Sequence, residues 1–410
     1  MNPAPALSSR GVWLLMLTAA AILMITMGVR QTTGLFLSPI GMATGLSVVS
    51  ISFAFAVAQL VWGAAQPIFG AFSDRYGPAL VITLGSLLMA AGLAATTMVE
   101  SESGLLLTQG LMVAAGAGAG SFSILIGAAA QRIPEEKRSF AAGFINAGGS
   151  AGQFVFAPIV QMVIAATGWI AAMLMLAVST LMTIPLAWTL RNRKTAPAPA
   201  TPAAAAIAPG IGMGRQIRQA YRDPSYLYLN LGFFTCGFHV AFLVTHLPGE
   251  VQICGLSASV ASASLALIGL FNIAGSLAAG ILGQKYRMKN LLALMYASRA
   301  LILIIYLLAP KTPTTFYIFA AALGFTWLAT VPPTAGLVGK LFGPRYLATL
   351  FGLTLLSHQI GGFFGAWLGG LAFERNGNYL WMWYIDIALA LLAAAANLPI
   401  KEAPMKARPA

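Results

Sequence analysis

Six ionisable side chains interrupt the long apolar runs of this sequence, and their types suit the binding of an anion or a proton. They are Arg30, His239, His246, Arg299, His358 and Asp386. Ionisable groups inside apolar helices are energetically costly and are usually retained for function. Arginine holds a carboxylate through two parallel hydrogen bonds, and imidazole takes up and releases protons near neutral pH.

Arg30 lies near the outer end of the first apolar run, where we predict that it contacts an anionic substrate. The alternative is that its charge reaches the membrane surface while its stem stays in the apolar region. His239 and His246 are two helical turns apart and share one helix face, and His358 is followed by Gln359. We predict substrate contacts from His239, His358 and Gln359, and proton coupling through one or more of the three histidines. Each histidine could equally be a structural hydrogen-bonding group.

Neutral polar residues on the apolar runs could complete a binding site. We predict that Gln59, Asn146 and Asn272 contact the substrate, although such residues also hydrogen-bond neighbouring helices. For Arg299 and Asp386 we predict a structural ion pair, since removing one member would leave a buried charge. The sequence carries no nucleotide-binding loop, metal cluster or nucleophile constellation, so we expect no cofactor, no metal and no enzymatic activity.

Composition points to lipid as the solvent of this chain. The 410 residues are 59% hydrophobic and only 8% charged, and the mean hydropathy is +0.82. A soluble domain carries about 25% charged residues. The net charge of +13 does not indicate nucleic acid, because the basic residues sit in short gaps between apolar runs. The two cysteines, Cys236 and Cys254, are too few for a disulfide framework.

Apolar runs of about 20 residues predict twelve transmembrane helices. They cover 12–38, 48–72, 79–99, 104–130, 139–164, 169–190, 226–248, 258–283, 290–309, 315–341, 346–372 and 379–399. Most basic residues fall in alternate gaps and near the two ends of the chain, which indicates the cytoplasmic side. We therefore expect a multi-pass inner-membrane protein with both termini in the cytoplasm. The run beginning near Val12 is too long for a cleaved signal peptide and is predicted to be the first helix.

The longest gap divides the chain into two similar halves. Residues 191–225 are rich in Ala, Pro and Gly in their middle and predict a cytoplasmic linker between bundles at 1–190 and 226–410. We also expect Pro332, with its neighbouring proline, to kink the tenth helix. The predicted fold class is an all-α membrane protein with two pseudo-symmetric six-helix bundles.

A short motif follows the second predicted helix of each half. It reads Gly70-x-x-x-Asp74-Arg75-Tyr76-Gly77 in the first half and Gly280-x-x-x-Gln284-Lys285-Tyr286-Arg287 in the second. The first copy resembles the G-x-x-x-D-R-x-G loop of the major facilitator superfamily, and this resemblance implies the major facilitator fold. It also implies that Gly70, Asp74, Arg75 and Gly77 latch the cytoplasmic side in one state, and that the second copy, which lacks the acid, behaves differently.

A narrower resemblance lies in the fifth and first predicted helices. The stretch from Lys137 to Gly152, KRSFAAGFINAGGSAG, resembles the monocarboxylate transporter pattern K-R-x-L-A-x-G-x-A-x-A-G-S-x-x-G, and GLFLSPI from Gly34 resembles that family's G-V-F-F-x-x-[IL]. The oxalate/formate antiporters share this general plan. A lysine of the family's first helix aligns with Arg30 or Gln31, and the resemblance does not decide between them.

Two departures from known patterns limit the transfer of function. Animal monocarboxylate carriers have an Asp and an Arg on the eighth helix, where this sequence has Asn272 and Ser276. Drug-type proton antiporters have an Arg at the start of the fourth helix, where this sequence has Gln109, which counts against drug efflux.

The sequence as a whole predicts a secondary transporter of a small organic anion, a monocarboxylate or related short carboxylate. Proton symport through histidine, or through a proton carried by the substrate, is the first expectation, and anion exchange is the near alternative. Efflux of an amphipathic compound is the second hypothesis, and a membrane sensor or scaffold that binds without transport is the third. We expect a monomer in the lipid bilayer, with the substrate and a proton as partners and no nucleic acid.

Overall fold

The computed structural model of the chain describes residues 9–130, 132–133, 135–191, 212–343 and 347–402. These residues form helices joined by short connections, and the described part of the chain contains no strand. The first half holds α1 (Ser9–Gln31), η1 (Thr33–Phe36), α2 (Leu37–Thr44), α3 (Val48–Tyr76), α4 (Pro78–Thr96), α5 (Glu102–Leu105), η2 (Leu106–Val113), α6 (Ala114–Ala119), α7 (Phe122–Ala130), α8 (Glu135–Thr167), α9 (Trp169–Leu181) and α10 (Thr183–Thr189). The second half holds α12 (Met213–Ala220), α13 (Pro224–Ile253), α14 (Ala258–Lys285), α15 (Met288–Leu308), α16 (Pro313–Thr326), α17 (Val331–Phe342), α18 (Leu347–Asn376) and α19 (Leu380–Asn397).

Eleven segments among the described residues are long and apolar enough to cross a bilayer. Helix α18, the eleventh span in chain order, supplies the remaining one; it has 30 residues, and the polar pair His358 and Gln359 lies in its middle. The twelve spans agree with the predicted ranges to within a few residues, so the all-α, twelve-helix prediction is confirmed. Within the predicted linker, residues 192–211 lie outside the described part of the chain.

Four of the described spans, the first, fourth, sixth and tenth, consist of more than one helical segment, and one interruption follows directly from the sequence. The tenth span breaks between α16 and α17, and α17 begins at Val331 with Pro332 in its first turn. Proline lacks the amide hydrogen that a helix interior needs, so a helix tends to restart at it. The kink expected at Pro332 is therefore confirmed. In the fourth span, η2 is a π-helical stretch that contains Gln109.

Glycine and proline set several helix ends. Gly77, at φ +90°, ends α3, and Pro78 opens α4 directly after it, which makes a tight connection between the second and third spans. Pro224 opens α13, and the carboxylate of Asp223 caps that helix by accepting a hydrogen bond from the Ser225 amide at 2.7 Å. Such caps satisfy backbone amides that have no partner inside the helix.

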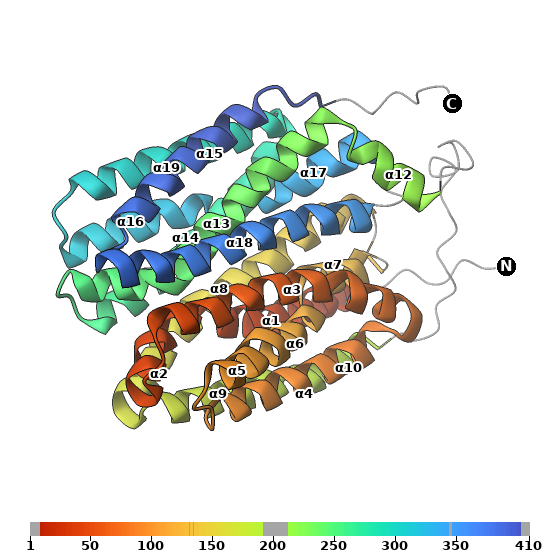
Figure 1. Cartoon of the computed structure of the whole chain (residues 1–410). Helices are drawn as coiled ribbons and strands as arrows, with labels where there is room; N and C mark the ends of the chain where they lie inside the picture. The colour runs from red at the N-terminus through yellow and green to blue at the C-terminus, as the bar shows by residue number, and fades with distance from the viewer. Residues whose placement is uncertain (1–8, 131, 134, 192–211, 344–346, 403–410) are drawn as a thin grey trace.

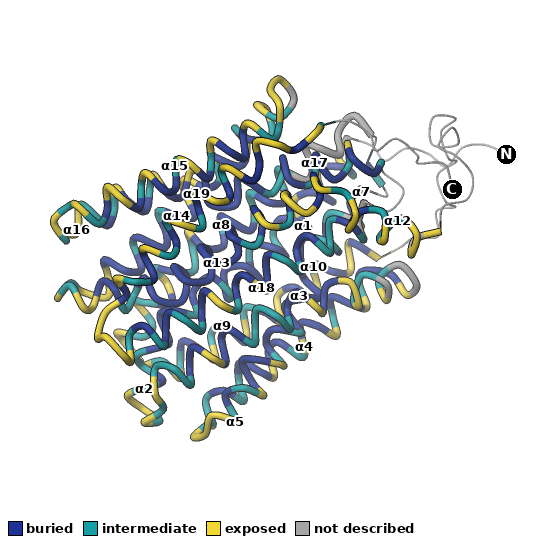
Figure 2. Tube along the Cα trace, turned by 45° about the horizontal axis from the view of Figure 1, so that its top comes forward, coloured by how far each residue is buried: buried dark blue, intermediate teal, exposed yellow. Residues whose placement is uncertain are grey.

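The helices lie in two layers. Figure 1 shows the spans of the first half below those of the second, with α3 next to α18, and the contacts between the layers also join α8 to α14. Helices α2, α5 and α16 lie toward one end, called here the α2 end, and α7, α12 and α17 lie toward the other, the α12 end (Figure 1). Figure 2 shows that buried residues gather on the inward faces of the helices and exposed residues on the outer faces and connections.

The two layers approach most closely toward the α2 end. A Cβ added to Gly34 would lie 2.1 Å from the Val244 carbonyl oxygen, and one added to Gly370 would lie 2.7 Å from Ser52 Oγ. Toward the α12 end of α3, α8, α14 and α18, four glycines have no described atom within 4 Å of an added Cβ. These are Gly70, Gly143, Gly280 and Gly352. Glycine at Gly34 and Gly370 thus permits a helix contact that any larger residue would push apart.

Candidate functional site

Arg30 occupies the last turn of α1 and turns its guanidinium into the first half. One Nη donates to Gln59 Oε1 of α3 at 2.7 Å, and the guanidinium carbon lies 4.0 Å from the centre of the Trp62 ring. A guanidinium over an indole face is attracted by the ring's negative quadrupole. The remaining donors of Arg30 can therefore hold an anion while Gln59 and Trp62 fix the orientation of the side chain.

A small cavity begins at Arg30. It is lined by Arg30, Thr33, Phe55, Ala58, Gln59, Gln109, Val113 and Ala114. An adjoining cavity shares Thr33, Phe55 and Gln109, and its other lining residues are apolar: Val29, Phe36, Leu93, Met173 and Leu176. Of the two positions left open by the sequence, Arg30 lines this cavity and Gln31 is not among its lining residues. The arrangement places one cationic group beside an apolar lining.

Gln109 is a lining residue that the sequence indicated only as a departure from drug antiporters. Its Nε2 donates to Thr96 Oγ1 at 2.9 Å. The side chain is buried from solvent and lines both cavities. It lies in the π-helical stretch η2, and such stretches occur frequently at functional sites. A lone amide in a long apolar run was the available signal.

Helix α18 brings the second half against this region. A Cβ added to Gly63 would lie 2.7 Å from Gln359 Cγ, and one added to Gly362 would lie 3.3 Å from Gln59 Cγ. His358 Nδ1 lies 3.0 Å from Gln359 Nε2, and its ring centre lies 4.9 Å from that of Phe233. Gln359 thus lies near Gln59, which was also predicted to contact the substrate. His358 packs inside the second half.

Asn146 and Asn272 form a polar bridge between the two halves. Asn146 Nδ2 of α8 donates to Ser276 Oγ at 3.2 Å, and Asn272 Nδ2 of α14 donates to Ser150 Oγ at 2.7 Å. Asn272 Oδ1 also accepts from the Leu328 amide at 2.9 Å. The structure therefore uses both asparagines to join helices, and a substrate contact from either stays a prediction.

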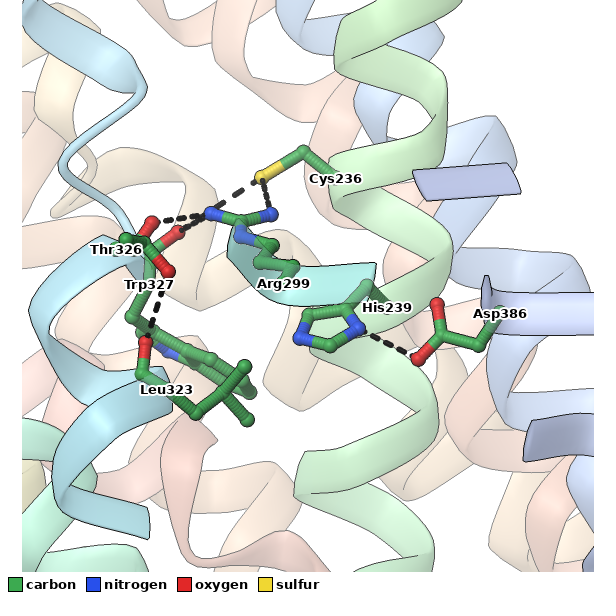
Figure 3. Close-up of polar contacts among 7 residues, drawn as sticks. All are labelled: Cys236, His239, Arg299, Leu323, Thr326, Trp327 and Asp386. Carbon is green, nitrogen blue, oxygen red and sulfur yellow. Dashed lines mark hydrogen bonds and ion pairs between the residues drawn. The ribbon is translucent and has the colours of Figure 1, made fainter. Parts of the chain in front are cut away.

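The predicted ion pair between Arg299 and Asp386 is not formed. Asp386 Oδ2 of α19 lies 2.6 Å from His239 Nδ1 of α13, and the two side chains are 0% and 1% exposed (Figure 3). Asp386 pairs with His239 because α13 packs directly against α19 and presents the imidazole to the carboxylate.

Arg299 instead satisfies backbone oxygens at the break in the tenth span. Its Nη2 donates to the carbonyl of Thr326 and, at 2.5 Å, to that of Trp327, and its Nη1 lies 3.3 Å from Cys236 Sγ (Figure 3). The end of α16 leaves such oxygens without helical partners. Arg299, on α15, therefore stabilises the break between α16 and α17 by hydrogen-bonding its free carbonyls.

His246 is held near the α2 end of α13. Its Nε2 lies 2.7 Å from the Ala366 carbonyl oxygen of α18, and its ring centre lies 5.2 Å from that of Tyr379 and 6.0 Å from that of Phe242. Because a carbonyl oxygen only accepts, Nε2 carries the hydrogen. The contact joins α13 to α18.

The family follows from the sequence and the fold together. The profile described as Major Facilitator Superfamily matches residues 18–366, which is most of the chain. The chain belongs to this superfamily. It is accordingly a transporter rather than an enzyme.

Characterised relatives of this major facilitator protein are distant but extend over nearly its full length. The oxalate:formate antiporter of Oxalobacter formigenes is 24% identical over 382 residues, covering 90% of this chain and 86% of that one. Monocarboxylate transporter 13 of Bos taurus is 25% identical over 371 residues, covering 90% and 84%. The crystal structure of a D-xylose-proton symporter superposes with a TM-score of 0.73 at 14% identity, covering 96% and 98%, which supports the fold alone.

The predicted latch of this major facilitator protein is only partly described. Gly77 ends α3 with positive φ, and a Cβ added to Gly70 would meet no described atom within 4 Å. The side chains of Asp74 and Arg75 lie outside the described residues, so the latch stays a prediction. Among the described residues, no group of three or more His, Cys, Asp or Glu side chains is placed to hold a metal ion.

Proposed function

We propose that this protein carries a small organic anion, a monocarboxylate or related short carboxylate, across the inner membrane by alternating access, linked to a proton. The observation that carries the proposal is the position of Arg30 on the wall of the cavity. The eight residues that line this cavity include one cation and no acid. A guanidinium oriented by Gln59 and Trp62 suits bidentate binding of a carboxylate.

The names of the relatives support the same class of substrate. An oxalate:formate antiporter and a monocarboxylate transporter both act on small carboxylates by their printed names. The apolar lining from Phe36, Leu93 and Met173 next to Arg30 suits an anion that carries an apolar portion. The single cation favours one carboxylate group over two.

The proposed orientation places the α12 end in the cytoplasm. Helix α12 carries Arg215 and Arg218, and basic connections remain preferentially on the cytoplasmic side. In this orientation the close contact at Gly34 lies toward the outer side, and Gly70, where an added Cβ meets no described atom within 4 Å, lies toward the cytoplasmic side. Alternating access would separate the contact at Gly34 in one of the two states.

Efflux of an amphipathic compound is the second candidate, and one observation favours it. The adjoining cavity is lined mainly by aromatic and aliphatic side chains, including Phe36, Phe55 and Met173. An extended apolar compound would use this lining without needing Arg30. The two candidates therefore differ in the sign and importance of substrate charge.

Uptake into proteoliposomes tests the proposal. Purified protein is supplied with a panel of labelled short carboxylates, with and without an inward proton gradient, and with and without unlabelled carboxylate inside. Gradient-stimulated uptake supports proton-linked transport, and uptake that needs internal carboxylate indicates exchange. No flux of any carboxylate, combined with export of an amphipathic dye, would replace the proposal with the second candidate.

A further inference from the structure

The pair formed by His239 and Asp386 is enclosed in the interior of the second half, away from Arg30. The two side chains are 1% and 0% exposed, and Nδ1 lies 2.6 Å from Oδ2. A charged carboxylate removed from water is costly unless a donor or cation compensates it. His239 supplies that donor from α13 to α19 (Figure 3).

Each member of the pair keeps one polar atom without a partner. Within the described residues, His239 Nε2 and Asp386 Oδ1 have no hydrogen-bond partner. Buried polar atoms are usually satisfied. His246 Nδ1 and His358 Nε2 also lack a partner among the described residues, so His239 differs from them by its contact with a carboxylate. When Nδ1 donates to the carboxylate, Nε2 presents a free lone pair, and a proton that binds there gives an imidazolium facing a carboxylate.

The other two histidines lack this arrangement. His246 Nε2 donates to the Ala366 carbonyl, and its ring lies between Phe242 and Tyr379 with no acid in contact. His358 Nδ1 lies 3.0 Å from the amide Nε2 of Gln359. An amide nitrogen donates, so protonation of His358 Nδ1 would remove that hydrogen bond. Among the described residues, His239 is the one histidine with a carboxylate in contact.

The surroundings of the pair contain charges of both signs. The ring centre of Trp327 lies 5.6 Å from that of His239. The backbone carbonyl of Trp327 accepts a hydrogen bond from Arg299 of α15. Arg299 also contacts Cys236, one turn before His239 on α13. The other titratable groups near this region include Cys236 itself, His358 of α18 and Tyr296 of α15, whose ring centre lies 5.3 Å from the Arg299 guanidinium carbon. Asn272 of α14 is neutral, and Glu250 is bonded to Tyr306 further toward the α2 end.

Asp386 is the acid in contact with His239, and Arg299 reaches the neighbouring turn of α13 at Cys236. In Figure 3 the free nitrogen of His239 faces away from Asp386, toward the side where Leu323 and Trp327 lie. The break in the tenth span is therefore the structural element that adjoins this nitrogen.

We propose that His239 and Asp386 form the proton-binding site of this transporter, in the opposite half from the anion site at Arg30. The proposal rests on the proposed function. Protonation forms an N–H bond at Nε2 as an O–H bond of a hydronium ion on one side of the membrane breaks. On the other side the N–H bond breaks and the proton returns to water. A proton on α13 and an anion held between α1 and α3 then cross together when the two halves reorient.

The test compares exchange with accumulation in proteoliposomes. His239→Gln and Asp386→Asn are expected to keep exchange of labelled for unlabelled carboxylate, which needs no net proton movement. Both are expected to lose accumulation driven by an inward gradient of one pH unit, from about tenfold in wild type to equilibration. His246→Gln, the same substitution two turns further along α13, is the matched comparison and is expected to keep the accumulation.

Each outcome of this comparison decides a different claim. Absence of carboxylate flux in wild type overturns the proposed function. Wild-type accumulation that persists in both His239→Gln and Asp386→Asn overturns the proton site alone.

A second measurement needs no substitution in the pair. With three histidines, imidazole ¹⁵N spectra of the wild-type protein can be assigned by comparison with His246→Gln and His358→Gln. Addition of a transported carboxylate is expected to convert the His239 imidazole from neutral to protonated. An imidazole at His239 that stays neutral while one of the other two changes overturns the proposal, even if no variant of the pair folds.

Discussion

Asn272 Nδ2 lies 2.7 Å from Ser150 Oγ, so one side chain of the second half donates a hydrogen bond to the first half. The same asparagine accepts from the Leu328 amide at 2.9 Å, inside the break between α16 and α17. Asn272 is 0% exposed. One asparagine side chain therefore hydrogen-bonds both the first half, at Ser150, and the break in the tenth span, at Leu328.

Asn272→Ala is expected to destabilise the protein by about 1–3 kcal/mol, because it leaves the buried Leu328 amide without a partner and removes the bond to Ser150. Thermal unfolding of the purified protein in detergent measures this as a lower Tm. Asn376→Ala is the matched control, since Asn376 is exposed and bonds only Ala372 of its own helix. An equal Tm change in both variants would show that the bridge adds no stability.

Gly34→Ala is expected to open the α2 end. The added methyl group would lie 2.1 Å from the Val244 carbonyl oxygen, so η1 and α13 must separate. With Thr33→Cys as reporter and Cys254→Ser as background, labelling by a membrane-impermeant maleimide from the α2 side should rise about tenfold for a shift of roughly 1.4 kcal/mol between states.

Gly352→Ala serves as the control for this experiment, because a Cβ there meets no described atom within 4 Å. It should leave the labelling of the Thr33→Cys reporter close to that of the parent. Labelling that does not change in Gly34→Ala would mean that the contact at Gly34 does not hold the α2 end closed.

Gln109→Glu is expected to raise KM for a carboxylate by about tenfold or more. The new carboxylate would share a cavity with Arg30 and compete with the substrate for its guanidinium. Gln109→Asn, which keeps the amide without the charge, should have a smaller effect. The concentration dependence of uptake gives KM for both variants, and an unchanged KM in Gln109→Glu would remove this cavity from the substrate path.

The fold was largely predictable from the sequence because a membrane span is a local property. Length and hydropathy identify each span without knowledge of its neighbours. The break before Pro332 was predictable for the same reason, since the missing amide hydrogen is a property of that residue. The side-chain partners were not, because they depend on which helices pack together.

The partner of Asp386 could not be predicted for this reason. Opposite charge suggested Arg299 as its partner, but α13 brings His239 to Asp386, and the carbonyls exposed at the helix break attract Arg299. Gln109 was overlooked as a lining residue although it is a lone amide in a long apolar run, because its contact with the cavity depends on the packing of η2 against its neighbours. For Asn272 the sequence left two interpretations open, and the structure shows the helix-joining one.

The central claim is that Arg30 binds the carboxylate, and the most direct test is uptake by Arg30→Gln and Arg30→Lys beside wild type. Arg30→Gln should reduce carboxylate uptake at least about a hundredfold, since a charged hydrogen bond contributes about 1.5–3 kcal/mol and the guanidinium can form two. Arg30→Lys should retain part of the uptake with a raised KM, because it keeps the charge and loses the planar fork. Wild-type uptake in Arg30→Gln, at equal protein folding and reconstitution, would contradict the account.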